Sequence, residues 1–243
     1  MIRPNENLYA PIGDQDAPPA EASSAGRVTA AYQAIREAIR SNVFPPGYQA
    51  AEVEIARQLG MSRTPVHEAM ARLQEDGLVR ILPKKGIIIR ALSATDIDEI
   101  YEVTIALEGA AAARIASFPP EQRQPVAEQL RQATSAMDKA LMKEDLKEWA
   151  LADEHFHELL VASSGNRRLM RMAGTVADQL HRARMFTLTL RPLPSQSSKE
   201  HLAIIAGIEA GDAEKASGAA RHHRQHARDQ LLPLIARLNL RNL

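Results

Sequence analysis

The chain of 243 residues contains no cysteine, so disulfide bonds and metal sites with thiolate ligands are both excluded. Phe, Trp and Tyr make up only 4% of it, and a sequence poor in aromatic residues but rich in Ala and Leu favours helices over sheets. It has no run of about 18 apolar residues and no signal-peptide pattern. We therefore expect a mainly helical, soluble protein of the cytoplasm with no membrane contact.

The formal net charge is zero, but the charges are unevenly distributed along the chain. The stretch from Arg27 to Leu92 has ten Lys and Arg residues against six Asp and Glu residues, whereas the acids are in excess both before and after it. A local excess of positive charge is the electrostatic footprint of a surface that binds nucleic-acid phosphates. The first third of the chain is therefore a candidate for nucleic-acid binding.

The stretch from Glu52 to Arg90 predicts a winged helix-turn-helix. Two short amphipathic helices are separated by a turn at Gly60, and two runs rich in Val and Ile, 78–82 and 86–92, predict a β-hairpin with a basic tip. A helix that a tight turn holds across a second helix has the geometry that enters the major groove of DNA. The alternative is a small helical core with a solvated polar face.

The second of these helices would carry the residues that read DNA. Val66, Met70 and Leu73 recur at helical spacing and form its apolar face. Ser62 precedes the helix as a predicted N-cap, whose hydroxyl can accept a hydrogen bond from a free backbone N–H. Donor side chains follow on the opposite face and at the hairpin tip. The predicted DNA-binding residues are Ser62, Arg63, Thr64, His67, Lys84, Lys85 and Gly86.

The chain is expected to divide into three parts. Residues 1–26 contain four prolines and no apolar period, which predicts a disordered arm. Residues 27–92 would form the winged helix-turn-helix domain, with a first helix that stops before Pro45. Residues 93–243 are helical in pattern almost throughout, which predicts an antiparallel all-α bundle. The predicted fold is thus mainly α, with one small β-hairpin.

Six helices are predicted in the bundle. Ser93, with Asp96 three residues later, predicts a capping box at the start of the first. Pro119-Pro120 is expected to separate the first two helices, and Pro233 to bend the last one. The approximate ranges are 94–117, 126–142, 146–163, 167–190, 197–210 and 212–238.

Seven of the eight histidines fall in this helical part. His157 lies one turn after Asp153 on a flank that continues into apolar residues, and His201 and His223 each share the apolar face of a separate helix. Their neighbours His222 and His226 are offset from the apolar seam, so both are expected to be solvated. Three histidines and one carboxylate therefore point inward from three helices.

These four groups suit a divalent cation. Each would cost roughly a few kcal/mol if it were buried alone, whereas Asp153, His157, His201 and His223 would all be satisfied around one metal ion. Nitrogen and oxygen donors without sulfur suit Zn²⁺, the first choice, and also Ni²⁺, Mn²⁺ or Fe²⁺. Five- or six-coordinate geometry would leave positions for the carboxylate of a ligand. The alternative is independent core or interface histidines with hydrogen-bond partners.

The run SRTPVHEAMARLQEDGLVRILPKKG resembles the DNA-binding signature of the GntR family of transcription regulators. The helical part resembles the FadR-type ligand-binding (FCD) domain of that family, through ALSATDIDEIYEV, DEHFHELL followed by ASSGN, EHLAII and GDAEKASGAARHH. The resemblance covers about Arg27 to Leu238. It implies that Asp153, His157, His201 and His223 are metal ligands, and that the metal lies beneath a pocket for a small organic acid.

Two positions depart from the family pattern. His67 stands where the P-V-R-E-A pattern has Arg, and imidazole reaches less far than a guanidinium and is mostly neutral at pH 7. Thr104 stands where Y-E-V-R has Arg, so the effector pocket would either recognise a different acid or use another cation. Arg182 and Arg184 are the candidates, which with Thr104 form the predicted effector-binding set, although at least one of the two is expected to be exposed to solvent.

Together these features predict a homodimeric transcription regulator that responds to a metabolite. Two heads would bind a palindromic operator in double-stranded DNA, and a small carboxylic or sugar acid would bind near the metal. One alternative is a metal-dependent hydrolase, since a site of three His and one Asp can activate water, although the sequence has no HExxH motif. Another is a DNA-binding module whose bundle only dimerises.

Overall fold

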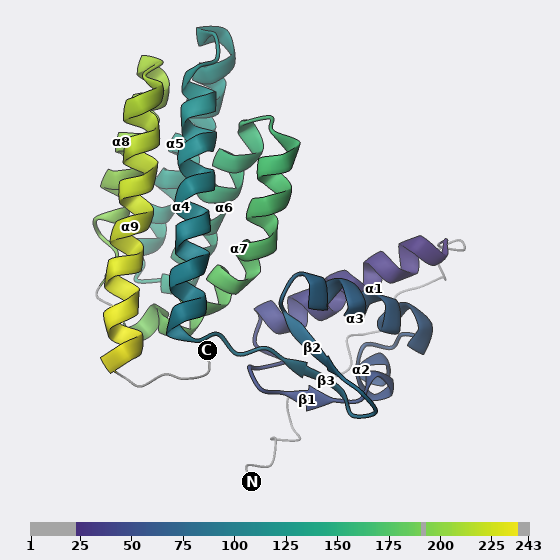
Figure 1. Cartoon of the computed structure of the whole chain (residues 1–243). Coiled ribbons are helices and arrows are strands. Elements are labelled where there is room, and N and C mark those ends of the chain that lie inside the picture. Colours follow the sequence, from purple (N-terminus) through teal and green to yellow (C-terminus); the bar gives the residue numbers. More distant parts are fainter. Residues whose placement is uncertain (1–22, 191–192, 238–243) are drawn as a thin grey trace.

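A head with a small sheet is joined to an upright bundle of long helices (Figure 1). The computed structural model describes residues 23–190 and 193–237. The head comprises α1 (Ser24–Arg40), β1 (Gln49–Ala50), α2 (Glu52–Gln58), α3 (Arg63–Glu75), β2 (Val79–Leu82) and β3 (Gly86–Ile89). The bundle comprises α4 (Ala94–Ala116), α5 (Pro120–Met142), α6 (Leu146–Ser163), α7 (Arg167–Thr187), the short 3₁₀ turn η1 (Leu188–Leu190), α8 (Ser197–Ala210) and α9 (Ala213–Arg237).

The predicted mainly-α class, with a winged helix-turn-helix followed by a helical bundle, is confirmed. The predicted arm lies outside the described residues as far as residue 22, but residues 24–26 already belong to α1. Helix α1 starts earlier than expected because Ser23 caps it, its hydroxyl accepting a hydrogen bond from the N–H of Gly26.

One apolar core holds the head together. Val66, Met70 and Leu73, predicted as the apolar face of α3, are fully buried, and Ile35 and Ile39 of α1 pack into the same core. Burial of such side chains stabilises a fold by about 1.5–3 kcal/mol each. Because α1 packs on α3 in this way, it belongs to the head although it precedes the helix-turn-helix.

The wing is a three-stranded antiparallel sheet with β3 between β1 and β2. The strand β1 was not predicted, since two residues are too few to show an alternating pattern. Conversely, residues 90–92 were expected to continue β3, but the strand ends at Ile89, opposite Val79, where β2 begins. The hairpin tip places Lys84 in the left-handed region, with φ of 64°.

The two serine caps behave differently. The capping box at Ser93 is confirmed: its hydroxyl accepts a hydrogen bond from the N–H of Asp96, whose carboxylate accepts one from the N–H of Ser93. Ser62 does occupy the N-cap position of α3, but its side chain makes no capping hydrogen bond. The third helical residue is Pro65, which has no N–H to donate. The exposed hydroxyl of Ser62 is therefore available to a partner outside the helix.

Helix α5 begins at Pro120, six residues before the predicted start. Proline is tolerated at the first position of a helix because that N–H has no partner within the helix. Pro125, inside the helix, leaves the carbonyl of Glu121 without its usual donor, and Glu121 is exposed to water. Pro233 likewise lies within α9, which continues to Arg237.

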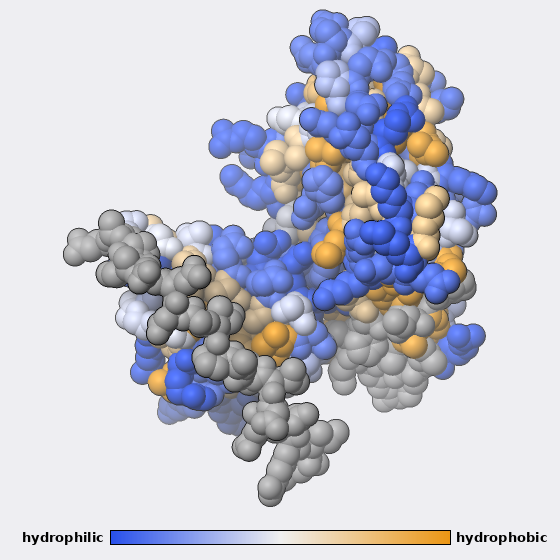
Figure 2. All heavy atoms as spheres, turned by 180° about the vertical axis from the view of Figure 1, so that it is seen from behind, coloured by the Kyte–Doolittle hydropathy of each residue, from blue (hydrophilic) through white to orange (hydrophobic). Residues whose placement is uncertain are grey.

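In the bundle, α4 packs along α9, and α5 packs against α6 and α8. None of the helices in the described residues is long and apolar enough to cross a membrane. Figure 2 shows the molecule from behind: hydrophilic residues dominate this face, and hydrophobic residues form small, separate patches.

Two glycines allow a matched test of the wing. A Cβ built on Gly86, whose φ is +92°, would lie 2.1 Å from the carbonyl oxygen of Ala50, whereas one built on Gly47, with φ of +78°, would meet nothing within 4 Å. We expect Gly86→Ala to destabilise the head by about 2–4 kcal/mol, through overpacking as well as backbone strain, and Gly47→Ala by only about 1 kcal/mol. Native-state hydrogen exchange of the head amides measures both values. Equal effects would show that β1 does not press on Gly86.

Candidate metal centre and nucleic-acid interface

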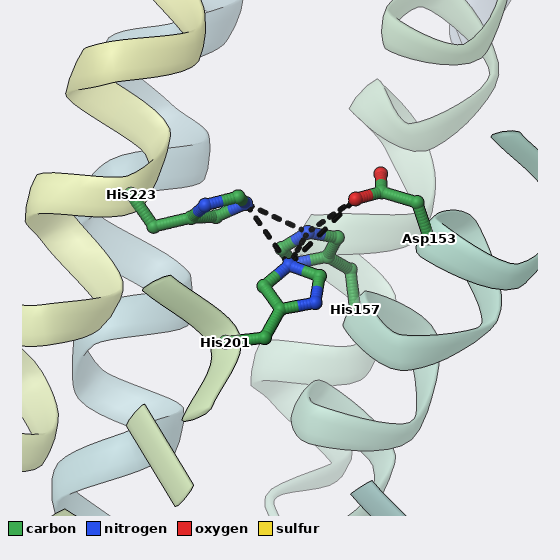
Figure 3. Close-up of side chains that lie close together, drawn as sticks. All are labelled: Asp153, His157, His201 and His223. Atoms are coloured by element: carbon green, nitrogen blue, oxygen red, sulfur yellow. Dashed lines mark hydrogen bonds and ion pairs between the residues drawn. The ribbon is translucent and has the colours of Figure 1, made fainter. Parts of the chain in front are cut away.

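Four side chains meet in the middle of the bundle (Figure 3). Asp153 and His157 come from α6, His201 from α8 and His223 from α9, and one ligand atom of each lies within 4.8 Å of the others. All four are buried. The faces predicted from helical spacing thus do converge.

Local sequence explains how the helices bring these groups together. Asp153 and His157 are four residues apart, so they lie one turn apart on the same face of α6. Helices α8 and α9 approach closely at Gly207, where a Cβ would lie 2.6 Å from the backbone nitrogen of Ala216. This close contact allows His223 on α9 to reach His201 on α8.

Three imidazole nitrogens face one another across a small triangle. The Nε2 atom of His201 lies 3.3 Å from that of His157 and 3.2 Å from that of His223, and the latter two are 3.2 Å apart. The Nδ1 atoms of His157 and His223 each lie 2.8 Å from a carboxylate oxygen, of Glu108 and Glu200 respectively. Because a carboxylate oxygen only accepts, each Nδ1 holds the ring proton. The Nε2 atoms of His157 and His223 therefore present lone pairs to the centre.

This arrangement fits a divalent metal ion. Metal–nitrogen distances of about 2.0–2.1 Å at a tetrahedral angle correspond to nitrogens about 3.3 Å apart, close to the observed separations. The Oδ1 atom of Asp153 lies 3.6 Å from Nε2 of His201 and 3.8 Å from Nε2 of His157, as a fourth donor. Carboxylates that hold the outer nitrogens of ligand histidines are a common feature of metal sites.

The ionisation states also suit a cation. Burial opposes charge on Asp153, but Arg184, with Nη1 2.6 Å from Oδ2, and His157 hold the pKa of this carboxyl well below its usual range. Burial, aided by the neighbouring His223, lowers the pKa of His201 well below that of a free imidazole. An ionised Asp153 and a neutral His201 are the forms that bind metals. Stacking on Phe156, with ring centroids 3.7 Å apart, fixes the ring of His201.

Glu108 and Glu200 were missed from sequence. Burial disfavours the charge on Glu108, but Arg224, which donates hydrogen bonds of 2.9 and 2.6 Å to the two carboxylate oxygens, and His157 hold its pKa far below the usual value. Glu200 also accepts a hydrogen bond from His226, which is half-buried and so not simply solvated as expected. A lone acid within the apolar stretch IALEGAAAA was the available signal for Glu108. His222 is exposed, as predicted.

Two cavities flank the cluster. The larger, of about 290 Å³, lies between α4, α6 and α7, and has His157 in its wall. The smaller, of about 70 Å³, adjoins Asp153 and His223 on the other side and is also lined by Trp149, the only tryptophan of the chain. The indole Nε1 of Trp149 is buried and has no hydrogen-bond partner among the described residues.

The predicted effector residues take different positions. Thr104 lines the larger cavity, although its hydroxyl donates a hydrogen bond to the carbonyl of Ile100. Arg184 lines both cavities. Arg182 lies away from them and donates a 2.9 Å hydrogen bond to the carbonyl of Arg90 in the head. Both arginines are buried, so the expectation that at least one is exposed was wrong: α7 is covered by the head on one side and by the bundle on the other.

The predicted DNA-contacting side chains lie on the exposed surface of the head. Arg63, Thr64 and His67 are exposed on α3, and Lys84 and Lys85 are exposed at the hairpin tip. Gly86 is half-buried against β1, which leaves no room there for a side chain. The Nδ1 atom of His67 lies 2.9 Å from both carboxylate oxygens of Glu52 on α2.

A winged helix-turn-helix head on an all-helical bundle with a buried His and Asp cluster defines a class of bacterial DNA-binding regulators. The chain belongs to the gntR family of bacterial regulatory proteins, whose family model matches residues 27–89, and an FCD domain matches residues 99–226. The chain is therefore a DNA-binding transcriptional regulator and not an enzyme, so the hydrolase alternative was wrong.

Three similar proteins agree with this assignment. An HTH-type transcriptional regulator in the TAR-I ttuE-ttuC' intergenic region of Agrobacterium vitis is 66% identical over 67% of this chain and 98% of its own length. The regulator YdhC of Bacillus subtilis is 31% identical over 80% of this chain and 86% of its own. A crystal structure of a GntR regulator from Rhodococcus sp. RHA1 superposes with a TM-score of 0.69 at 26% identity, covering 85% of this chain and 98% of the other.

The buried Glu108–Arg224 pair next to His157 should be essential for the stability of the bundle. We expect Glu108→Ala to lower the free energy of unfolding by about 3–5 kcal/mol, because it leaves Arg224 buried without its partner. Glu108→Gln, which keeps one acceptor, should lower the free energy of unfolding by less. Glu158→Ala, at an exposed position on α6, should change it by no more than about 0.5 kcal/mol. Urea unfolding of chelator-treated protein, followed by circular dichroism, measures all three. Equal stability of Glu108→Ala and the parent would contradict the structural role.

Proposed function

We propose that this regulator acts in the cytoplasm as a homodimer whose bundle binds a divalent metal ion and a small organic acid, and whose two heads bind a palindromic operator. The observation that carries the proposal is the triangle of imidazole nitrogens, with two outer nitrogens held by carboxylates. A bundle that served only for dimerisation would not require three buried imidazole nitrogens to converge in this way.

Asp153, His157, His201 and His223 would hold the metal, with Zn²⁺ as first choice and Ni²⁺, Mn²⁺ or Fe²⁺ compatible with the same donors. When bound, the ion would supply positive charge and free coordination positions for a ligand carboxylate. Glu108 keeps the ring of His157 in the tautomer that offers Nε2.

The effector site would adjoin this cluster. Arg184 is buried and lines both flanking cavities, so of the two predicted arginines it is the better candidate for binding the effector. Thr104 lies in the wall of the larger cavity, which suits a small carboxylic or sugar acid in size. Arg182, bonded to the head, is better suited to a structural role.

In the head, Arg63, Thr64 and His67 would face the major groove, while Ser62 and the tip residues Lys84 and Lys85 would contact phosphates or the minor groove. Two heads related by a dimer axis match two operator half-sites. Gly86, which has no room for a side chain on the side that faces β1, would approach DNA through its backbone.

Metal content tests the cluster. We expect one divalent ion per chain in the parent and less than about one-tenth of that in His201→Ala, because the variant loses a central ligand. His222→Ala, which removes an exposed imidazole beside His223, should keep the parent's content. Elemental analysis of purified, dialysed proteins gives the stoichiometry. A full complement of metal in His201→Ala would remove this residue from the ligand set.

DNA binding tests the head. We expect Arg63→Ala to weaken binding to a duplex, selected by the parent from a random pool, by about tenfold or more, since one base or phosphate contact is worth about 1–3 kcal/mol. Arg168→Ala, an exposed arginine at the start of α7, removes the same charge from the bundle and should leave the affinity unchanged. Gel-shift titration at one fixed salt concentration provides the values. The selected duplexes should carry an inverted repeat. Equal affinities of Arg63→Ala and the parent would contradict the proposed role of α3.

A further inference from the structure

Helix α7 has two functional faces. One face, with Ala173, Ala177 and Leu180, forms a wall of the larger cavity beside the cluster. The other, with Asp178 and Gln179, bonds to the head. A single helix therefore contacts both the candidate ligand space and the DNA-binding unit.

The first link to the head is ionic. Asp178, which is only 3% exposed, accepts hydrogen bonds from two arginines of α1: Arg36 binds both of its oxygens, and Nη1 of Arg40 lies 2.6 Å from Oδ1. Arg40 also donates to both oxygens of Glu154 on α6, each at 3.0 Å. Arg36 and Arg40 are one turn apart, so one face of α1 is held by two helices of the bundle.

Two further links run to the DNA-reading elements. Gln179 donates a 3.0 Å hydrogen bond to the carbonyl of Asp76, the C-cap residue of α3. Contact there is tight, because a Cβ on Gly77 would lie 2.9 Å from the side-chain nitrogen of Gln179. Arg182 donates to the carbonyl of Arg90, directly after β3. The bonds of α7 thus reach α1, the end of the predicted recognition helix and the end of the wing.

The cavity and these links share residues. Arg36 of the head and Glu154, the partner of Arg40, both line the larger cavity together with His157. The wall from α7 is largely apolar, and the charged side chains of the lining include both carboxylates, such as Glu154, and cations, such as Arg36 and Arg184. The organic acid of the proposed function would therefore place an apolar body against α7.

We propose that α7 couples the two units: a ligand in this cavity moves α7 and loosens its bonds to α1, Asp76 and Arg90, which frees the head. This inference rests on the proposed function, because it describes how the effector would act. A ligand shifts an equilibrium only through different affinities for two arrangements, and by linkage a head held by DNA changes the affinity of the cavity to the same extent.

The absence of cysteine permits a test that needs neither metal nor DNA. Ala177→Cys, in the cavity wall, is reacted with N-ethylmaleimide, which places a small uncharged group in the cavity. Thr175→Cys, on the exposed side of α7, is labelled as the matched control. We expect at least threefold faster hydrogen exchange in peptides covering the last turns of α1 and residues 76–90 for labelled Ala177→Cys only. Unchanged exchange in the head after complete labelling, verified by mass, would overturn the proposal.

Asp178→Asn tests the route. In a protein that carries Asp178→Asn, the head peptides should exchange faster than in the parent even without the label. Labelling at Ala177→Cys should then raise the exchange rate by a smaller factor than it does when Asp178 is present. An undiminished effect of the label would show that the coupling bypasses Asp178 and would overturn the route. Ala173→Cys, in the same wall, repeats the measurement if Ala177→Cys is unfolded by circular dichroism. The labelling experiment uses neither metal nor DNA. A negative result would therefore overturn the coupling through α7 but not the proposed metal site or operator binding, and negative results for those two would not change the outcome of the labelling experiment.

Discussion

Three imidazole nitrogens point at one another in the buried interior of the bundle, and this contact constrains the side chains around it. Such a group is stabilised when each ring keeps one tautomer and when the lone pairs that face the centre share a partner. Glu108 and Glu200 fix two of the tautomers, and Arg224 in turn holds Glu108. The polar interior is therefore a connected network in which ligand geometry and the folding of α4, α8 and α9 depend on one another.

The same network extends towards the head in few steps. Glu154 directly follows the candidate ligand Asp153 in α6, and it accepts hydrogen bonds from Arg40 of α1. His181 of α7 lies 2.9 Å from Glu154, and the neighbouring Arg184 bonds to Asp153. Burial opposes ionisation of Glu154, but His181 and Arg40 lower its pKa to about 2. The charged groups at the junction of head and bundle thus lie close enough to those around the cluster for the two sets to interact electrostatically.

The sequence alone predicted those features whose signals are local. Helical spacing placed Asp153, His157, His201 and His223 on inward faces, since residue chemistry and a period of 3.6 residues suffice for that. It did not predict Glu108 as the partner of His157, because the two are 49 residues apart and meet only through helix packing. For the same reason, spacing within α7 could not show that Arg182 faces the head whereas Arg184 faces the cluster.

The single tryptophan has a spectroscopic consequence. Trp149 lines the smaller cavity next to Asp153 and His223, and its indole N–H is buried without a partner in the described part of the chain. Since the chain has no other tryptophan, its entire indole emission originates at this one place. Water or a carboxylate that enters the cavity and accepts the indole hydrogen would shift that emission to longer wavelength. The protein therefore carries an intrinsic optical reporter of polarity beside its candidate metal centre.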